Sequence, residues 1–455
     1  MALSVYQWEV EEVAMAKILI VGLGVSGQAV ARYLYQNEIA FGLADERVCG
    51  ADETLLRQTY PEMTLHLGSF KEDVFLDYET IVLSPGVSRK HPAVAAAIAA
   101  GVEVICDIEV FARVVNAPVI AVTGSNGKST VVDLLQQMAQ SANIDSRLGG
   151  NYGVAALDLI DQQEAELYIL ELSSFQLEST YSLKPAAAVV LNISEDHMDR
   201  YEGLPDYIEA KAKVYKQAAH QIINRDDMQA RELSGSTNAI SFGLDAPDEN
   251  QFGLIKIDEV EWLAQGETAL LPVNELKILG RHNIANAMAA LALGQAVNIP
   301  MVSMLSALRN YQGLSHRTQW VADINGVTWI NDSKATNVGA TQAALQGMEV
   351  PVILLAGGQA KGADLTPLTS AAANTVKTAI LFGEDADQLE LVLNDACDVI
   401  RVDDLPAAVF HANEIAHNGD VVMLSPACAS FDMFSSYTER GDVFIRLVNG
   451  LQVNQ

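Results

Sequence analysis

Short apolar runs rich in β-branched residues alternate, from Ala16 to about Asp107, with stretches in which apolar residues have helical spacing. Such alternation predicts strands joined by helices, and parallel strands require crossover connections of this kind. The predicted strands are 16–24, 41–47, 64–70, 80–86 and 102–107, and the predicted helices are 26–37 and 91–101. We therefore expect a parallel sheet with crossover helices in this region.

Two further regions repeat the pattern. In the second, the predicted strands are 117–124, 167–174 and 186–194, followed by an Ala-rich helix at 282–297. In the third, the predicted strands are 327–333, 350–358, 377–384 and 420–427. A chain of 455 residues is long enough for about three domains. We expect an α/β protein with domains at 1–107, 108–314 and 315–455, and a linker at 313–321.

Composition and charge limit the partners and the cellular compartment that we expect for this chain. The chain has 28 basic and 58 acidic residues, and its formal net charge of −30 argues against a nucleic-acid partner. Four cysteines without zinc-site spacing, Cys49, Cys106, Cys397 and Cys428, indicate a reduced cytoplasmic protein. We expect no membrane span and no secretory signal, and we expect residues 1–14 to be a loose extension or an overlong start assignment.

A glycine-rich turn follows the first predicted strand. Residues 22–27 fit the pattern G-x-G-x-x-G, and Asp45 follows at about the spacing of a ribose-binding acid. The pattern indicates a diphosphate-containing ligand more safely than a nicotinamide dinucleotide, and a tight turn without a ligand is the plain alternative. The turn Ser84-Pro85-Gly86 is expected at the same edge of the sheet.

The stretch TGSNGKST, residues 123–130, gives the strongest local signal. Lys128 would reach the β- and γ-phosphates of a nucleotide, while Ser129 or Thr130 could offer a hydroxyl to Mg²⁺. Backbone N–H groups of 124–128 could surround the phosphates. The general P-loop pattern has a glycine where this chain has Val122, and an ordinary strand–turn–helix connection is the alternative.

Acidic residues follow two other strands of the second region. Glu171 comes at the end of one, where a Mg²⁺-binding carboxylate would be placed, and Glu195, Asp196, His197 and Asp199 follow another. Taken alone, this histidine is more often a satisfied or exposed side chain than a ligand. Lys211 would ordinarily be a solvated helical lysine, and its ammonium could ligate a metal only if its charge were lost or modified.

Three polar turns end strands of the third region. They are 331–337, with the sequence NDSKATN, the Gly pair before Lys361, and the stretch from Ser425 to Ser430. Each alone could be a capped turn, but three on one sheet edge predict a site. Cys428 lacks an identifiable histidine partner and is expected to be a small core thiol.

Taken together, the motifs closely resemble the Mur ligases of peptidoglycan synthesis. The motifs are TGSNGKST, ELSSFQLE, NISEDHMDRY, GRHNIANAMAA, LSHR, NDSKATN and LSPACASFD, in this order. The resemblance extends from about Ala16 to the C-terminus and is most marked for the members that add D-glutamate to UDP-N-acetylmuramoyl-L-alanine. This family uses a short T-G-x-N-G-K-[ST] loop, so Val122 is no defect.

The resemblance implies a Rossmann-like first domain for the UDP group, a central ATPase domain and a Rossmann-like third domain for the amino acid. It implies that ATP phosphorylates the alanyl carboxylate and that the amine of D-glutamate attacks the acyl phosphate, giving an amide, ADP and phosphate. Two Mg²⁺ ions and a CO₂-derived carbamate on Lys211 are implied as well. We expect the protein to be a monomer.

The resemblance also implies roles for individual residues. Lys128, His197 and carbamylated Lys211 would be catalytic, and the metal ligands would be Ser129, Glu171, His197 and Lys211. Residues at the ATP site would be Gly124, Ser125, Asn126, Gly127, Lys128, Ser129, Thr130, Asn286, Arg317 and Asp332. The UDP-linked substrate would meet Gly24, Val25, Ser26, Asp45, Glu46, Arg47, Ser84, Pro85, Gly86, Asn151 and His197. D-glutamate would be surrounded by Thr336, Lys361, Ser430 and Tyr437.

Some positions depart from the family pattern. Glu46 stands where a hydroxyl residue is more usual, which bears on the uridine contact, and Gln359-Ala360 replaces the commoner Asp-Gly or Asp-Lys before Lys361. The nearest rival is a related ligase for another amino acid, or a folate polyglutamylating enzyme. A nicotinamide-dependent oxidoreductase that uses residues 22–27 and a non-catalytic nucleotide-binding regulator are the rivals from other classes.

Overall fold

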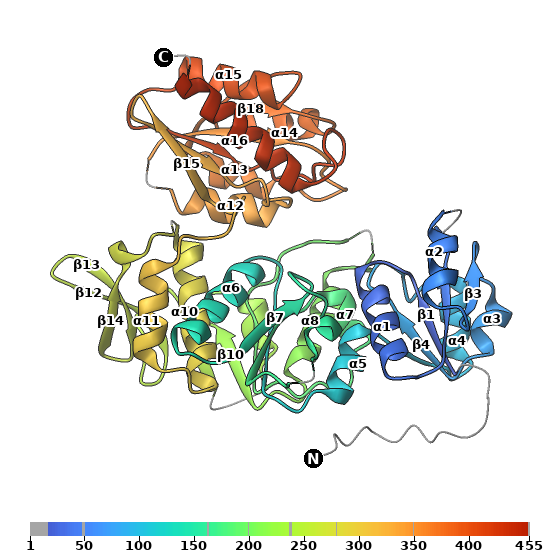
Figure 1. Cartoon of the computed structure of the whole chain (residues 1–455). Coiled ribbons are helices and arrows are strands. Elements are labelled where there is room, and N and C mark those ends of the chain that lie inside the picture. The colour runs from blue at the N-terminus through green and yellow to red at the C-terminus, as the bar shows by residue number, and fades with distance from the viewer. Residues whose placement is uncertain are drawn as a thin grey trace.

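Three β-sheets follow one another along the part of the chain that the computed structural model describes (Figure 1). It describes residues 17–47, 51–161, 163–198, 200–235, 239–278, 280–348 and 350–453. The sheets have five, nine and six strands, and helices cover them. The predicted α/β class is thereby confirmed. The predictions for residues 1–14, Ala16, Cys49 and Asp199 concern positions outside the described residues.

The first sheet is parallel throughout, in the order β3-β2-β1-β4-β5. Its strands are β1 (Ile18–Val21), β2 (Phe41–Asp45), β3 (Thr64–Leu67), β4 (Thr80–Leu83) and β5 (Glu103–Ile105). Its helices are α1 (Val25–Gln36), α2 (Ala51–Thr59), α3 (Glu72–Leu76), α4 (Pro92–Ala99) and α5 (Asp107–Val114). Alternate residues of β1 point to opposite faces, so Ile18 packs with α1 and α5 while Leu19 packs with α3 and α4.

The second sheet is mixed, in the order β14-β13-β12-β11-β10-β9-β6-β8-β7. Its parallel strands are β6 (Val119–Thr123), β7 (Ser146–Gly150), β8 (Leu167–Glu171), β9 (Ala187–Val190), β10 (His220–Asn224) and β11 (Ile240–Phe242). Its helices are α6 (Lys128–Ser141), η1 (Ala156–Leu159), α7 (Ser174–Glu178), α8 (Leu204–Ala212), η2 (Lys213–Tyr215), α9 (Met228–Glu232), α10 (Arg281–Ala296) and α11 (Met301–Asn310). Helices α6, α10 and α11 share one core cluster with its strands.

An antiparallel meander, which the sequence analysis missed, extends this sheet at one edge. It consists of β12 (Phe252–Ile257), β13 (Val260–Gln265) and β14 (Thr268–Pro272), and η3 (Val273–Glu275) follows. Asp258 and Glu259 join the first two strands, and both have positive φ. Such turns are usually marked by Asn-Gly or Asp-Gly, and this one carries no glycine.

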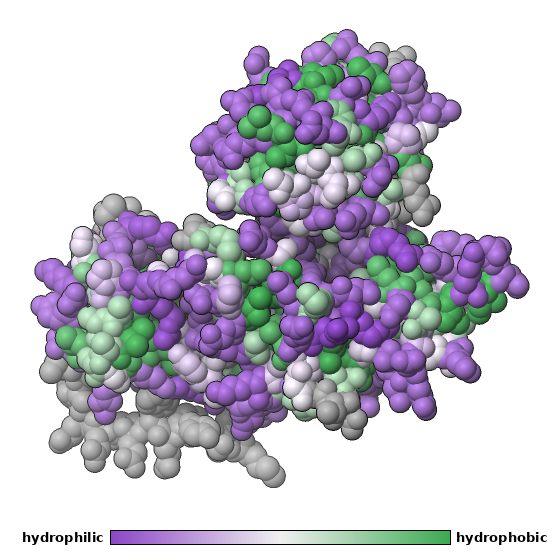
Figure 2. Space-filling view, turned by 180° about the vertical axis from the view of Figure 1, so that it is seen from behind, coloured by the Kyte–Doolittle hydropathy of each residue, from purple (hydrophilic) through white to green (hydrophobic). Residues whose placement is uncertain are grey.

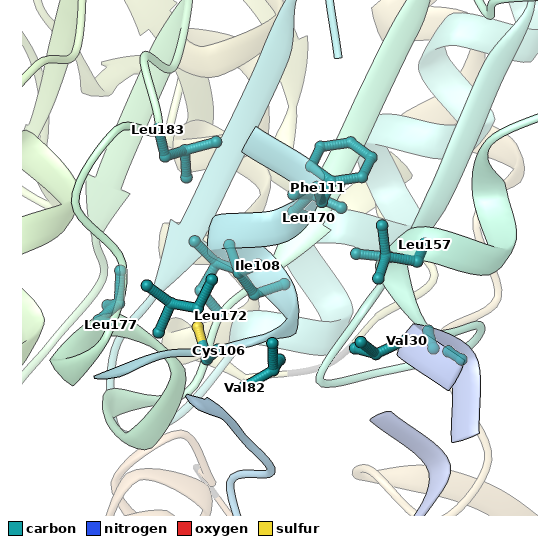
Figure 3. Packing of buried hydrophobic residues seen from close by; sticks show 14 of the residues in the cluster. Val30, Val82, Cys106, Ile108, Phe111, Leu157, Leu170, Leu172, Leu177 and Leu183 are labelled. Carbon is teal, nitrogen blue, oxygen red and sulfur yellow. The ribbon is translucent and has the colours of Figure 1, made fainter. Parts of the chain in front are cut away.

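The first and second sheets share one hydrophobic core. Val30 of α1, Val82 of β4 and Phe111 of α5 belong to the same buried cluster as Leu170 of β8 and Leu177 of α7 (Figure 3). Burying one such side chain contributes about 1.5–3 kcal/mol. The relative position of the two sheets is therefore fixed by apolar packing rather than by surface pairs alone.

The third sheet has the order β15-β16-β20-β17-β18-β19, with only β15 antiparallel to its neighbour. The strands are β15 (Gln319–Ile324), β16 (Val327–Asn331), β17 (Val352–Gly357), β18 (Val376–Phe382), β19 (Asp398–Arg401) and β20 (Val421–Leu424). Helices α12 (Val338–Gln346), α13 (Pro367–Ala372) and α14 (Ala386–Leu393) pack on one face, and α15 (Leu405–Ile415) and α16 (Tyr437–Val453) on the other.

Residues 311–318 connect α11 to β15 without forming a helix or a strand. The predicted linker, 313–321, is thus too long at its end, because Gln319 already belongs to β15. Beyond this connection the third sheet stands apart from the row formed by the first two (Figure 1). Among the described helices, none combines the length and the apolar character that a bilayer crossing requires.

Candidate active site

The loop 124–127 joins β6 to α6 and lies at the centre of the site. Gly127 has φ +84°, and a Cβ there would lie 2.4 Å from Oδ1 of Asn286 in α10. Only glycine fits, because the backbone has to pass this closely. Asn283, also buried, accepts a hydrogen bond from Asn286 at 3.2 Å and so helps to orient the amide that lies against the loop.

Two lysines converge on this loop. Nζ of Lys128 donates to the carbonyl oxygens of Gly124 and Ser125, both at 2.8 Å, and Nζ of Lys211 donates to Gly124 at 2.9 Å. Burial lowers the pKa of both ammonium groups, well below its usual value for Lys211, and Glu171 and Asp196 counteract the shift. The ammonium of Lys128 places positive charge at this loop, which suits phosphate oxygens, whereas the lowered pKa of Lys211 favours its uncharged amine.

Ser129 and Glu171 form the predicted metal pair. Oγ of Ser129 donates to Oε2 of Glu171 at 2.6 Å, and Nδ2 of Asn151 donates to Oε1 at 2.7 Å. The pairing arises because β6 and β8 are parallel neighbours whose carboxyl ends meet at one edge. A hydroxyl beside a carboxylate is a donor set that Mg²⁺ accepts. Arg317 completes the group by donating to Oγ of Ser129 at 2.8 Å.

His197 and Lys211, the other two predicted metal residues, lie on different segments. His197 has a φ of +58°, and its ring lies 3.6 Å from Asp196 and 4.9 Å, between centroids, from Phe175. Nζ of Lys211 lies 4.5 Å from the ring centroid of Tyr207, whose hydroxyl is 3.0 Å from Ser125. Lys211 is thus enclosed, whereas His197 is partly exposed.

In the glycine-rich turn 22–27, which follows β1 of the first sheet, polar side chains form hydrogen bonds with the backbone. Asp45 accepts from the N–H groups of Leu23 at 2.6 Å and Arg47 at 2.7 Å, and Ser84 donates to Gly22 at 2.6 Å. A Cβ on Gly27 would lie 1.9 Å from the Gly22 carbonyl oxygen, so this position requires glycine. Asp45 therefore shapes the loop, in addition to any contact with a ribose.

The outer face of this turn is open. Val25 is 73% exposed, and a Cβ on Gly24 or Gly86 would meet no atom within 4 Å. Glu46, the unusual residue, accepts from the Phe70 N–H at 3.3 Å and lies 3.7 Å from His91. Arg47 is exposed, whereas in the neighbouring turn Ser84 is buried and Pro85 is half-buried. Asp107, the first residue of α5, is buried, and burial raises its pKa. Hydrogen bonds from Ser26 and Gln176 oppose this rise.

Asp332 lies in a buried network at the strand ends of the third unit. Its two oxygens accept from the Thr318 N–H at 2.9 Å and from Oγ of Ser425 at 2.8 Å. Burial raises its pKa to about 6, while these hydrogen bonds and Arg317 oppose the shift. The carboxylate therefore titrates close to neutral pH.

The predicted amino-acid residues surround the same edge. Lys334 lies with Nζ 4.0 Å from the ring centroid of Tyr437, and burial together with Arg317 and Lys128 lowers its pKa to about 8. Lys361 has a φ of +54°, and its Nζ lies 5.5 Å from the ring centroid of Phe431. Ser430 is buried and Thr336 is half-buried.

Arg440 ties three strand-end turns together from behind. Its guanidinium, 0% exposed, donates to Oγ and the carbonyl of Ser333, to Gly357 and to Cys428, at 2.9–3.2 Å. Burial lowers the pKa of Arg440 to about 10. Buried Cys428 has its pKa raised by burial to about 12, which fits the expected core thiol.

Family models match most of the chain. The Mur ligase MurD-like N-terminal domain matches residues 16–106, the Mur ligase middle domain residues 122–294 and the glutamate ligase domain of Mur ligases residues 316–428. Proteins of Nitrosococcus oceani and Pseudomonas fluorescens, both named UDP-N-acetylmuramoylalanine–D-glutamate ligase, are 45% and 47% identical over 436 and 438 residues. The matches cover 95% of this chain and 96% and 98% of the relatives.

The chain belongs to the Mur ligase family.

Solved structures agree with the fold of this Mur ligase. A pseudomurein peptide ligase from Methanothermus fervidus matches with a TM-score of 0.61 at 15% identity, covering 96% of this chain and all of the other. A UDP-N-acetylmuramate–alanine ligase from Thermotoga maritima matches with a TM-score of 0.58 at 16% identity, covering 96% and 100%. These likenesses concern the three-unit architecture.

Several residues that organise the site of this Mur ligase were not predicted from its sequence. Asn283, three residues before Asn286, was open to discovery because residues three apart share a helix face. Arg440 lies in a charged stretch of a helix, TERGD, and no local pattern marks it as buried. Arg200 lies in the recognised motif NISEDHMDRY, but nothing in the sequence shows which segment it contacts.

Proposed function

We propose that this Mur ligase adds D-glutamate to UDP-N-acetylmuramoyl-L-alanine with ATP, through an acyl phosphate. The relatives that are 45–47% identical along nearly their whole length are named for this reaction. The observation that supports it best is the Ser129–Glu171 pair, 2.6 Å apart, beside two lysines that converge on the phosphate-loop carbonyls. A carboxylate is a poor electrophile, and phosphorylation gives it a leaving group.

The chain's own residues fit the chemistry of this reaction. Lys128 and the loop N–H groups would bind the β- and γ-phosphates, and Ser129 and Glu171 would hold one Mg²⁺. Bound Mg²⁺ neutralises the crowded anions during phosphoryl transfer. Arg317 would orient the same phosphates from the linker side, because it already donates to Ser129. Asn286 and Asp332 complete the proposed ATP site.

We infer that carbamylated Lys211 and His197 hold a second Mg²⁺. CO₂ adds to an uncharged amine, and burial lowers the pKa of Lys211 well below its usual value, which favours that form. The product is an oxygen-bearing anion that can ligate a metal. In ¹³C-bicarbonate the wild-type enzyme should show a carbamate signal in NMR that the K211A variant lacks. An unchanged spectrum in the wild type would rule the carbamate out.

The three proposed domains, 1–107, 108–314 and 315–455, divide the substrates among them. The open turns around Val25 and Gly86 would receive the UDP group, with Asn151 and His197 nearer the alanyl end, and Lys361, Ser430, Thr336 and Tyr437 would surround D-glutamate. Hydrogen exchange tests this division. UDP should slow exchange near 22–27 and 84–86, and D-glutamate, with the other substrates present, near 361 and 430.

We place the enzyme in the cytoplasm, where ATP is supplied, as a monomer. Light scattering at micromolar concentration checks the oligomeric state: a mass near 49.0 kDa supports the monomer, and twice that mass contradicts it.

The decisive experiment measures phosphate release with ATP, Mg²⁺ and UDP-N-acetylmuramoyl-L-alanine. D-glutamate, L-glutamate, L-lysine or meso-diaminopimelate is added in turn. Release that depends on D-glutamate alone supports both the reaction and its specificity. Release with another amino acid keeps the chemistry and changes the substrate, and no release from folded enzyme contradicts the proposal.

A further inference from the structure

Arg200 connects the nucleotide-substrate turn of the first unit to the second unit. Its Nη1 donates to the carbonyl oxygen of Pro85 at 2.7 Å and its Nη2 to that of Val87 at 2.9 Å. These carbonyls flank Gly86, where a Cβ would meet no atom within 4 Å. The guanidinium thus fixes the back of a turn whose front is open.

The same side chain is fixed by the ring of Phe175. Its Cζ lies 4.1 Å from the ring centroid, and the rings of His197 and Tyr201 lie 4.9 and 5.9 Å from it. Phe175 belongs to α7, which follows Glu171 closely in the chain. The backbone N–H of Arg200 also donates to the carbonyl of His197 at 2.9 Å. Arg200, which lies in the same segment as His197, therefore contacts both the turn 84–87 and the helix α7 that follows Glu171.

An arginine suits this place better than a lysine. Its planar fork donates in two directions at once to carbonyls on either side of a residue, while its face stacks on an aromatic ring. A lysine ammonium would reach one carbonyl and would lose the stacked contact. The acceptors are neutral carbonyls, so the function of this group is geometric rather than that of an ion pair.

We propose that Arg200 is a positioning residue that sets the distance between the UDP-binding turn, 84–87, and the phosphoryl-transfer centre around Lys128. This inference rests on the proposed function, in which one substrate spans both places. A ligand that spans two subsites gains affinity only when their spacing matches its length. The alanyl carboxylate of the spanning substrate must also come within about 3–3.5 Å of the phosphorus that ATP transfers to it.

The test compares the spanning substrate with one that fills the first subsite alone. Calorimetry on the full chain would give the affinities of UDP and of UDP-N-acetylmuramoyl-L-alanine for wild type, R200K and R200A. We expect UDP affinity to change by less than about twofold, affinity for the spanning substrate to fall roughly tenfold, and kcat to fall with it. Guanidinium chloride at low millimolar concentration should restore part of the R200A activity.

The matched control is K90M. Lys90 pairs with Glu202 at 2.8 Å across the same junction, but both side chains are well exposed, so its loss should leave both affinities unchanged. If R200A is poorly folded by circular dichroism, R200K still decides the question. Equal losses for UDP and the spanning substrate, or no loss for either, would overturn the inference. Wild-type binding of the spanning substrate without D-glutamate-dependent turnover would instead overturn the proposed function.

Discussion

Arg317, in the connection before the third sheet, donates a hydrogen bond to Oγ of Ser129 at the start of α6, although 188 positions separate them. The bond places a guanidinium from the linker on the first turn of the phosphate-loop helix. Ser129 simultaneously donates to Glu171. One hydroxyl is therefore shared between the predicted metal carboxylate and a cation that belongs to another part of the chain.

Replacing Arg317 should impair phosphoryl transfer. We expect R317K to reduce kcat for phosphate release by roughly 10²-fold, in the range seen when one charged or hydrogen-bonding group at a transition state is lost. The exposed Arg309, which pairs with Glu275, offers the control R309K. An R317K enzyme with wild-type kcat would show that the bond to Ser129 does not matter for turnover.

Lys128 should be indispensable. K128M removes the ammonium that donates to Gly124 and Ser125, and we expect phosphate release to fall by at least about 10³-fold. The exposed Lys256 on β12 provides the control K256M, which should keep full turnover. Substantial phosphate release by folded K128M would contradict the proposed ligase and favour a regulator in which this loop only binds nucleotide.

Asp332 links pH to the free energy of unfolding. Its pKa is raised from 3.8 to about 6 by burial, so the folded state binds the proton more tightly than the unfolded state. The free energy of unfolding therefore falls as pH rises from about 4 to 6 and stays lower above it, by on the order of 3 kcal/mol.

The D332N variant separates this stability effect from activity. Asparagine can still accept from Thr318 and donate to Ser425, so D332N should be more stable than wild type at pH 8 and show little gain at pH 4. Its turnover should nevertheless fall, since the carboxylate is lost. Urea unfolding at both pH values measures the difference, with D323N on the exposed side of β15 as the control. If the free energies of unfolding of wild type and D332N differed by the same amount at both pH values, the predicted pH dependence would be wrong.

Replacing Arg440 should chiefly lower the free energy of unfolding. R440M leaves the carbonyls of Ser333, Gly357 and Cys428 buried without their donor, and we expect a loss of about 3 kcal/mol or more in the free energy of unfolding. R446M alters an exposed position of the same helix and should cost little. Equal urea midpoints for R440M and R446M would show that the bonds to the three turns contribute nothing net.

The candidate site residues at strand ends could be predicted from the sequence, because parallel strands place their carboxyl ends at one edge of a sheet. That rule is consistent with the pairing of Ser129 and Glu171 that the family resemblance implied, and the two side chains are hydrogen-bonded at such an edge. It could not show that Asp45 turns its carboxylate back onto the Leu23 N–H, because the same spacing suits a ribose contact. Which side chain is buried between distant turns, as Arg440 is, depends on how whole units pack.

The antiparallel meander β12–β14 was not predicted for a different reason. Strands β12 to β14 are partly exposed and contain charged residues, so their alternation is weak, and the Asp258–Glu259 turn lacks the glycine that usually marks a hairpin. The shared core around Phe111 was also beyond prediction. Apolar periodicity shows that a helix face is buried but does not identify the sheet that covers it.

The network around Arg440 bears on how the enzyme could move. Because one guanidinium bonds the turns at Ser333, Gly357 and Cys428, a hinge rotation at 311–318 would carry the third unit as a rigid body. Such a rotation would break side-chain bonds between the third unit and the phosphate loop, such as that from Asn337 to Asn126 at 3.3 Å. The turns proposed to surround D-glutamate would keep their relative positions during that motion.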